Sequence, residues 1–270
     1  MSSSEVTNHE LLAGAAYGDD RHLAARQALY HWQTPRYDLP AIVVRELADT
    51  TGLVIDLGCG NGKFIRKLHT ERPDLRTIGL DISAGILRDV EPPVVVADAQ
   101  HLPFGDEIAD AILAMHMLYH VEDIDAGIGE IRRLLRRDGI AIASTNSQRD
   151  KVELEQLWSR AAADILGIEQ GPRRISLSSR FCLEAAPRML RRHFAHVRTL
   201  ELPGVIVLTD PEPIIAHLGS YEAWAAQMAV PFGDTLARAR EIATREIHEH
   251  GSFRISCLGG ILVCHGHPAT

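Results

Sequence analysis

The amino-acid sequence predicts an α/β fold, with a parallel, doubly wound sheet built mainly from the first half of the chain. Three observations support this prediction. Short apolar runs alternate with amphipathic helical stretches between about residues 51 and 146. The first run leads directly into a glycine-rich loop, and an acidic residue ends each of the next two. Because strands separated by single helices pair in parallel, these run ends should meet at one edge of the sheet.

The elements of this half follow one another in a regular order. Apolar runs predict strands at residues 53–57, 77–81, 94–97, 109–115 and 140–143. Helical periodicity predicts helices at about 61–70, 83–90 and 123–135. Ser83 and Asp123 are suited to cap the second and third of these helices, and Gly139 ends the third.

The flanking segments are predicted to be mostly helical. Residues from about 8 to 49 have a helical pattern that is interrupted near Pro35. After the core, helices are expected at 152–166, 181–194 and 211–250, the last broken around 231–233. Residues 196–207 look extended, and 253–264 alternate as one or two closing strands would.

Composition narrows the class of protein. Of 270 residues, 46% are hydrophobic and 24% are charged, which is typical of a soluble globular protein. We expect no membrane span, because no apolar run approaches about 20 residues. The N-terminus lacks a basic segment followed by an apolar one, so a cytoplasmic protein is expected.

The charge pattern argues against a nucleic-acid partner. The net charge is −8, whereas neutralising phosphates requires a basic surface. The basic run at residues 132–137 falls at the end of a predicted helix, where cations complement the helix dipole. The cysteines Cys59, Cys182, Cys257 and Cys264 form no C-x-x-C pair, so we expect free thiols and no metal site.

The glycine-rich loop has the pattern D-x-G-x-G-x-G at residues 56–62. A dinucleotide-binding loop would need glycine at position 63, where the chain has Lys63. A phosphate-binding loop would need glycine at 57 and a hydroxyl residue at 64, where Leu57 and Phe64 stand. The carboxylate of Asp56, just before the glycines, would repel a pyrophosphate and would suit an ammonium group.

Two further carboxylates indicate other parts of the same ligand. Asp81 ends the second strand, where an acidic residue can accept hydrogen bonds from both ribose hydroxyls. Asp98 ends the third strand and can accept from an exocyclic amine. A ligand with an amino acid, a ribose and an adenine, and without phosphate, would satisfy all three carboxylates.

Residues from about 42 to 146 therefore resemble the class I S-adenosylmethionine methyltransferases, in the broad group similar to the ubiquinone and menaquinone biosynthesis enzymes. Five motifs in order carry the resemblance, at residues 54–62, 79–83, 97–104, 109–113 and 118–121. It implies S-adenosyl-L-methionine as the cofactor. It also implies a Rossmann-like sheet of seven strands whose last strand is antiparallel, for which 253–264 is the candidate.

The resemblance assigns the cofactor contacts. Gly58, Cys59 and Gly60 would line the methionine moiety. Asp81 would bind the ribose, Ile82 would pack on the adenine, and Asp98 with Ala99 would read its edge. The remaining residues that we assign to the cofactor are Asp56, Asn61, Gln100, Met115 and Tyr17, the last from an N-terminal segment expected to fold over the site as a lid.

Methyl transfer from a sulfonium needs mainly proximity and alignment, and a base only when the acceptor must lose a proton. His116 and His120 follow the fourth strand and are the candidate bases, since histidine titrates near neutral pH. A purely structural role is the alternative for both.

We therefore expect four parts: an N-terminal helical lid (1–50), a cofactor-binding core (51–148), a substrate cover with late core elements (149–250) and closing strands (251–270). The cover contains many large apolar residues, which favours a small, largely apolar acceptor such as a secondary metabolite or quinone-like precursor. Those side chains could instead bury one another. They are Leu157, Trp158, Phe181, Met189, Leu190, Trp224, Met228 and Phe232.

Several questions stay open from the sequence. The methyl group could go to carbon, oxygen or nitrogen. An RNA or protein methyltransferase is one alternative, and a cofactor-binding protein without catalysis is another. A homo-oligomer is neither indicated nor excluded.

Overall fold

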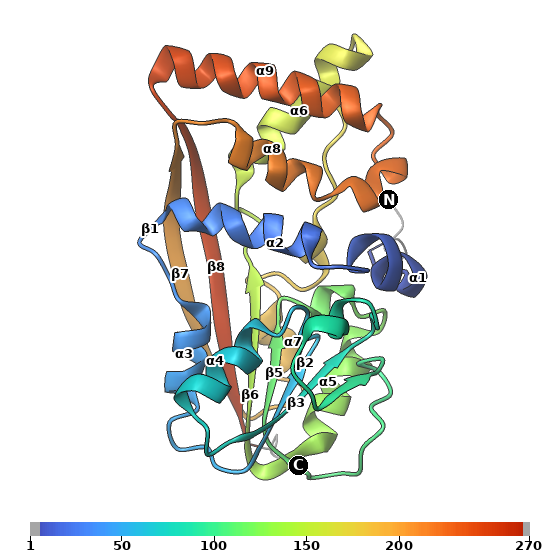
Figure 1. Ribbon diagram of the computed structural model, residues 1–270, viewed down its shortest axis with the longest axis vertical. Coiled ribbons are helices and arrows are strands. Elements are labelled where there is room, and N and C mark those ends of the chain that lie inside the picture. Colours follow the sequence, from blue (N-terminus) through green and yellow to red (C-terminus); the bar gives the residue numbers. More distant parts are fainter. Residues whose placement is uncertain (1–5, 267–270) are drawn as a thin grey trace.

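The computed structural model of the protein describes residues 6–266, and its centre is one eight-stranded sheet of order β1-β7-β8-β6-β5-β2-β3-β4 (Figure 1). The strands are β1 (Gln33–Thr34), β2 (Leu53–Leu57), β3 (Arg76–Asp81), β4 (Val94–Val96), β5 (Ala109–Met115), β6 (Leu135–Asn146), β7 (His196–Leu208) and β8 (Phe253–His265).

The parallel half of this sheet confirms the predicted doubly wound arrangement. Strand β2 pairs in parallel with β3 and β5, so that Val54 lies opposite Thr77 on one side and Ala111 on the other. Strand β8 then runs antiparallel to β6, as expected of the closing strand. The carboxyl ends of the parallel strands therefore share one edge, where open α/β sheets bind ligands.

The sheet has eight strands rather than seven. The additional strand is β1, which pairs antiparallel with β7 through Gln33 and Ile206. It lies in a segment predicted to be helical. A two-residue strand has no periodicity of its own, and it exists because the edge of β7 offers it unpaired backbone groups.

The α-helices agree with the predictions where the apolar periodicity is long. They are α1 (His9–Leu11), α2 (Arg21–Ala28), α3 (Leu39–Glu46), α4 (Lys63–Glu71), α5 (Ile124–Leu134), α6 (Val152–Leu166), α7 (Ala186–Leu190), α8 (Glu212–Gly219) and α9 (Phe232–His250). Asp123 caps α5 as expected, because its Oδ1 accepts from the Ala126 amide at 3.1 Å. Short 3-10 turns and one π-helical turn, Leu12–Ala16, connect several of these helices.

Two predicted helices are shorter than expected. The helix predicted at 181–194 is reduced to the five residues of α7, and the one at 83–90 is a 3-10 turn at Ile86–Asp89. At the second site the Ser83 hydroxyl still accepts from the Ile86 amide, but it also donates to the Tyr17 carbonyl at 2.8 Å. This bond ties the N-terminal segment to the sheet edge.

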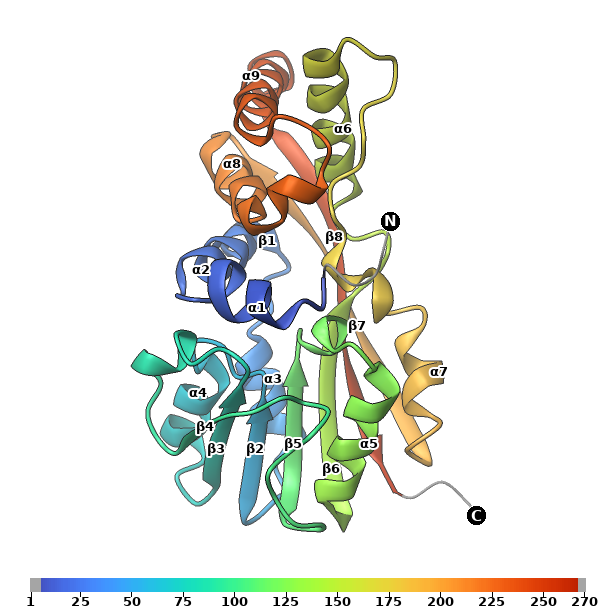
Figure 2. The ribbon, with the colours of Figure 1, turned by 90° about the vertical axis from the view of Figure 1, so that its right-hand side faces the viewer.

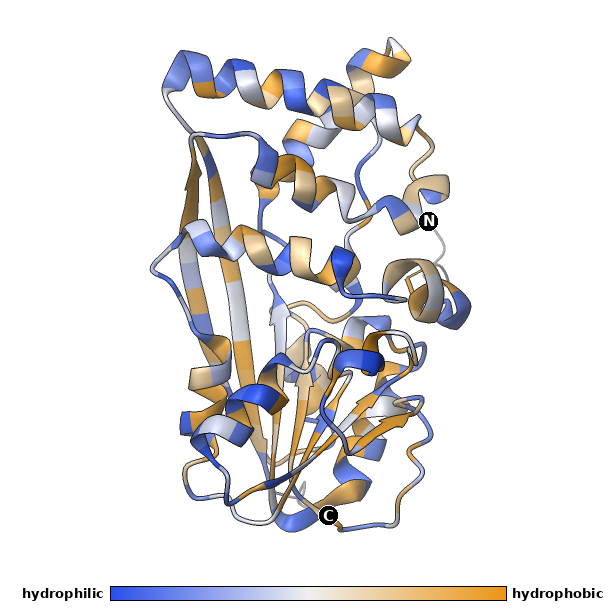
Figure 3. Cartoon of the chain, in the orientation of Figure 1, coloured by the Kyte–Doolittle hydropathy of each residue, from blue (hydrophilic) through white to orange (hydrophobic). Residues whose placement is uncertain are grey.

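The molecule divides into a sheet-based half and a helical cover. Figure 2 shows α1 and α2 between the sheet edge and a cover of α6, α8 and α9, while β7 and β8 run through both halves. Helix α3 belongs to the sheet-based half, because Ile42 and Val43 pack with Val54 and Leu68. Figure 3 shows hydrophobic strands in the lower half and hydrophilic residues along much of α9.

Carboxylates pair with two arginines of the basic run at residues 132–137. In the basic run, Arg133 pairs with Glu130 and Asp106, and Arg136 pairs with Asp110. Within residues 6–266, no helix is long and apolar enough to cross a membrane, and no cluster of metal-ligating side chains is present. All four cysteines are buried free thiols.

Candidate functional site

The glycine loop follows β2 and turns tightly at the sheet edge. Gly58, Gly60 and Gly62 have φ of +67°, +53° and +71°, a left-handed conformation that favours glycine. A Cβ on Gly58 would lie 2.7 Å from the Met117 side chain, and one on Gly60 would lie 2.9 Å from Leu23. Glycine therefore permits both the turn and a close approach of neighbouring groups.

Asp81 lies at the end of β3 beside this loop. Its Oδ2 accepts from the Gly60 amide and its Oδ1 from the Ser83 amide, both at 3.0 Å. Burial raises the pKa of Asp81, and the backbone donors only partly oppose this shift. Each carboxylate oxygen is thus fixed in place and keeps a lone pair for a further donor.

Asp98 follows β4 and faces the same space. The Gln100 amide donates to its Oδ1 at 2.9 Å, and the Gln100 side chain donates to it at 3.2 Å. The Gln100 Oε1 in turn accepts from the Asp123 amide. Gln100 does not line the cavity described below, and its side chain orients Asp98.

Asp56 also lies outside the lining of the cavity. Its side chain is 1% exposed and lies behind the loop rather than among the cavity-lining residues. Both carboxylate oxygens lack a hydrogen-bond partner among the described residues. Burial, with a smaller contribution from Asp81, raises the pKa of Asp56 to about 8. The carboxyl group is an unsatisfied acceptor beneath the glycines.

His116 begins the segment after β5. Its φ is +56°, a strained value for a residue other than glycine, and its ring lines the cavity. Burial, assisted by the positive charge of Lys151, lowers the pKa of His116 to about 4. The imidazole is therefore neutral at pH 7 and can accept a proton or a hydrogen bond.

His120 has a different role, because both of its ring nitrogens are occupied. The Val6 carbonyl lies 3.0 Å from Nδ1 and can only accept, so Nδ1 carries the proton. Nε2 then accepts from the Tyr17 hydroxyl at 2.8 Å. Burial lowers the pKa of His120 to about 4, and its ring stacks at 6.4 Å on Trp224. This geometry supports the structural alternative, in which His120 fastens the N-terminal segment.

One cavity of about 660 Å³ joins these residues. It runs from the glycine loop past Asp81 and Asp98 to the base of the helical cover. The residues predicted for the site that line it are Tyr17, Gly58, Cys59, Gly60, Asn61, Asp81, Ile82, Asp98, Ala99, Met115, His116 and His120. The structure thus brings together all the predicted residues except Asp56 and Gln100.

The cover does not present the apolar face that was expected. None of its eight large apolar side chains lines the cavity, and Trp158, Phe181 and Trp224 are fully buried. They pack among themselves, as the 5.4 Å ring contact of Trp158 with Phe232 shows. They belong to the same apolar cluster as Ile206 of β7 and Ile255 of β8, so packing of the cover against these strands uses the apolar residues.

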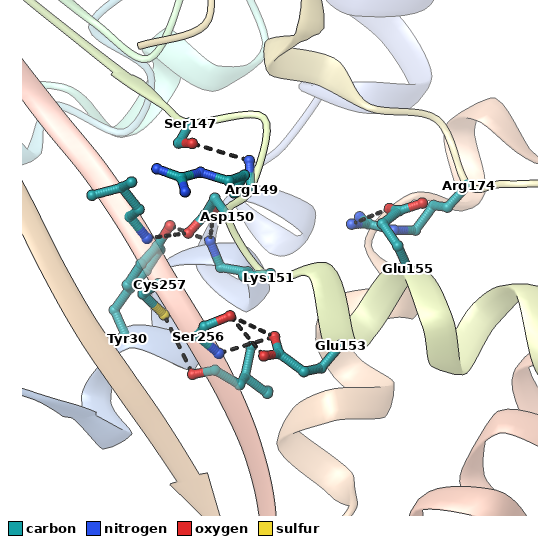
Figure 4. Close-up of polar contacts among 12 residues, drawn as sticks. Tyr30, Ser147, Arg149, Asp150, Lys151, Glu153, Glu155, Arg174, Ser256 and Cys257 are labelled. Carbon is teal, nitrogen blue, oxygen red and sulfur yellow. Dashed lines mark hydrogen bonds and ion pairs between the residues drawn. The ribbon is translucent and has the colours of Figure 1, made fainter. Parts of the chain in front are cut away.

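Polar and charged residues line the cavity beneath the cover instead. Figure 4 shows Lys151, which precedes α6, with its ammonium ion-paired to Asp150 and donating to the Tyr30 hydroxyl at 2.6 Å. Burial lowers the pKa of Lys151, but the charge of Asp150 and the contact with Tyr30 outweigh it and leave the pKa raised. Burial also raises the pKa of Tyr30 to about 12, so the phenol is protonated at pH 7.

A second buried ion pair lies one helical turn further along α6. Arg174 Nη2 is 2.7 Å from Glu155 Oε1 (Figure 4). The Arg174 guanidinium lies 4.3 Å from the centre of the Tyr221 ring. His217 on α8 lines the same wall. Sequence reasoning missed these residues, since they lie in separate segments without a shared motif. The only signals were the adjacent charges at 150–151 and 173–174.

Comparison with known proteins identifies the sheet-based half. A model of the methyltransferase domain family matches residues 55–143, the segment that holds the glycine loop, Asp81, Asp98 and both histidines. Residues 55–143 are a class I methyltransferase domain. The cofactor of this domain is S-adenosylmethionine, which confirms the expected family and cofactor.

Relatives with different acceptors share this domain. A malonyl-[acyl-carrier protein] O-methyltransferase of Methylococcus capsulatus is 32% identical over 43% of this chain and 45% of its own. A demethylmenaquinone methyltransferase of Roseiflexus is 35% identical over 32% and 39%. A tRNA (carboxymethyluridine(34)-5-O)-methyltransferase of Arabidopsis thaliana is 28% identical over 44% and 30%. The aligned segments span less than half of each relative.

A solved structure confirms the fold beyond the methyltransferase domain. A protein of Anabaena variabilis, assigned as a methyltransferase from an antibiotic biosynthesis pathway, superposes with a TM-score of 0.58. The superposition covers 83% of this chain and 95% of that one at 16% identity. The likeness therefore extends to the arrangement of the sheet and its helices.

The residues of the methyltransferase domain fit its cofactor. The left-handed glycines keep the loop free of side chains, and Asp81 holds two oriented oxygens toward the cavity. Beneath the loop, the unsatisfied Asp56 carboxyl is a hydrogen-bond acceptor, and the charge of a nearby ammonium group would lower its raised pKa and favour the carboxylate. These features match the amino-acid and ribose parts of S-adenosylmethionine.

Proposed function

We propose that the protein transfers a methyl group from S-adenosylmethionine to a small organic molecule held beneath the helical cover. One observation carries this proposal: a single cavity of about 660 Å³ connects the glycine loop with the chamber around Tyr30, Lys151 and Arg174. Its volume is within the usual range for small-ligand pockets. Because the cavity must hold the cofactor as well, the remaining space suits a small acceptor.

The bound cofactor supplies an activated methyl group on a cationic sulfur. The chain supplies alignment and exclusion of water. Asp81 and Asp98 would hold the nucleoside part, and the glycine loop would hold the methionine part. The N-terminal segment closes over them through the bonds of Tyr17 to His120 and Ser83.

His116 is our candidate for proton handling where the acceptor loses a proton. Its neutral imidazole faces the cavity, whereas the nitrogens of His120 are already bonded. The pKa of about 4 makes His116 a weak base in the unliganded protein. A negatively charged acceptor group nearby would raise that pKa and strengthen the base.

Methyl-labelled S-adenosylmethionine tests the proposal directly. The purified protein would be incubated with cell extract that has been separated into small molecules, RNA and protein. We expect label in the small-molecule fraction, and none when Gly60→Val replaces the wild-type chain. Label in RNA or protein would refute the small-molecule acceptor. Normal binding of S-adenosylhomocysteine without labelling of any fraction would indicate a cofactor-binding protein.

A further inference from the structure

The wall of the chamber beneath the cover holds buried donors that lack partners. Arg174 has a side chain that is 7% exposed, and its Nε and Nη1 have no hydrogen-bond acceptor among the described residues. His217 is 3% exposed, and neither of its ring nitrogens has a partner there. Buried polar groups are almost always hydrogen-bonded, so these donors point to an absent acceptor group.

The three residues Arg174, His217 and Tyr221 form one cluster. The Arg174 guanidinium lies 4.3 Å from the centre of the Tyr221 ring, and the His217 ring contacts the same ring at 5.7 Å. Burial, assisted by the charge of Arg174, lowers the pKa of His217 well below its ordinary value. His217 is therefore neutral at pH 7, with one N–H to donate.

Arg26 adds a second guanidinium to the Tyr221 ring. Its Nη1 donates to the Ser220 carbonyl at 2.9 Å, while its buried Nη2 lacks a partner in the described part of the chain. Its Cζ lies 5.8 Å from the centre of the Tyr221 ring and 5.0 Å from that of Tyr17. Arg26 thus connects the cluster with the wall of the cofactor site.

The local charges do not balance. Three cations line this part of the cavity, namely the buried Lys151 and Arg174 and the half-buried Arg26. Two carboxylates face them, Asp150 paired with Lys151 and Glu155 paired with Arg174. No carboxylate within residues 6–266 is in ion-pair distance of Arg26. The difference, three minus two, leaves one positive charge.

We propose that Arg174 and His217, with Arg26, bind a carboxylate group of the methyl acceptor. This inference rests on the proposed function and names its substrate class, a small monocarboxylate. A carboxylate supplies the acceptors that the unpartnered N–H groups lack and neutralises the single excess charge. Arginine suits this task because its planar fork stays charged and directs its donors. The site would reject a neutral acceptor of the same shape, since desolvated cations discriminate strongly between charged and neutral ligands.

The test uses pairs of small carboxylates and their uncharged amides, for example benzoate with benzamide and octanoate with octanamide. Calorimetry on the full chain, saturated with S-adenosylhomocysteine, would measure both members of each pair. At least one carboxylate should bind roughly 10- to 100-fold more tightly than its amide, the range expected for hydrogen bonds to a charged group. Equal affinities within every pair would overturn the inference.

Substitutions then locate the preference. Arg174→Gln should abolish it and Arg174→Lys should retain part of it, while Arg160→Gln, an exposed arginine on α6 outside the cavity, should leave it unchanged. Glu155→Gln should strengthen carboxylate binding, because it releases Arg174 from its internal partner. This gain cannot arise from a loss of folding. A preference that persists in Arg174→Gln, or a weakening in Glu155→Gln, would refute the assignment.

Binding of S-adenosylhomocysteine separates the two hypotheses. We expect it to be unchanged in the Arg174 and Glu155 variants. If the wild-type chain fails to bind S-adenosylhomocysteine, the proposed function fails. If that binding is normal and no carboxylate is preferred, only the substrate class fails.

Discussion

Substituting Asp81 tests the cofactor site most directly, because this side chain joins the loop and the ligand. Asp81→Ala removes two carboxylate oxygens, held by the Gly60 and Ser83 amides, that we propose accept from the ribose hydroxyls. Hydrogen bonds to a charged group contribute about 1.5–3 kcal/mol each, and water partly compensates for their loss. We therefore expect binding to weaken by roughly 2–4 kcal/mol, or about 30- to 700-fold in Kd.

Calorimetry with S-adenosylhomocysteine measures this effect. Asp81→Asn keeps one oxygen acceptor and should lose about half of the binding free energy lost by Asp81→Ala. Asp89→Ala removes an exposed carboxylate nearby, outside the cavity, and should bind normally. A Kd for Asp81→Ala within threefold of wild type would show that Asp81 only organises the backbone at Gly60 and Ser83.

Three further perturbations address the loop, the lid and the buried carboxyl group. Gly60→Val should abolish S-adenosylhomocysteine binding and lower the unfolding free energy by about 1–3 kcal/mol. The reason is that the φ of +53° at position 60 strains a branched residue, and a Cβ there approaches Leu23. Normal affinity by calorimetry would contradict this prediction. Tyr17→Phe leaves His120 Nε2 without its donor, so the backbone amides of residues 6–17 should exchange hydrogen several-fold faster, as measured by mass spectrometry. Unchanged protection would show that the bond between Tyr17 and His120 does not hold the N-terminal segment in place. Asp56 has its pKa raised to about 8 in the folded chain, so between about pH 4 and 8 the native state holds a proton that the unfolded state has lost. Stability of the cofactor-free protein should then fall with rising pH by up to about 1.4 kcal/mol per unit, and Asp56→Asn should remove this slope in urea unfolding; parallel slopes for the two proteins would refute the assignment.

The parallel strands and the glycine loop could be predicted because the sequence patterns that indicate them are local. Each strand of the parallel half contains a short apolar run, although β6 extends beyond its run at 140–143. The loop glycines mark a turn that other residues rarely adopt. By contrast, β1 and the shortened α7 depend on tertiary contacts. Gln33 becomes a strand residue only because Ile206 lies at an open edge. Helical periodicity around α7 could not show that residues 191–194 leave the helix before β7.

The residues of the chamber beneath the cover could not be predicted from the sequence, for a related reason. Tyr30, Lys151, Arg174 and His217 come from four separate segments, and each alone is an ordinary polar residue. Only the packing of the N-terminal segment against the cover brings them to one cavity. Gln100 and Asp56 belong to motifs that the sequence did reveal. A motif alone does not show which of its polar side chains lines the cavity and which lies behind the lining residues.

We propose that the cover sets the polarity of the chamber that holds the acceptor. Trp158 and Phe232 pack on one another within an apolar cluster that continues onto β7 and β8, so they stabilise the cover without lining the cavity. The cover residues that do reach the cavity include Lys151 just before α6, Arg174 in the loop after it, and His217 within α8. Substitutions at these positions should change the polarity of the chamber without altering the apolar cluster that holds the cover. Acceptor specificity in this protein should therefore follow the polar residues around the start of α6 and the loop after it, rather than the aromatic content of the cover.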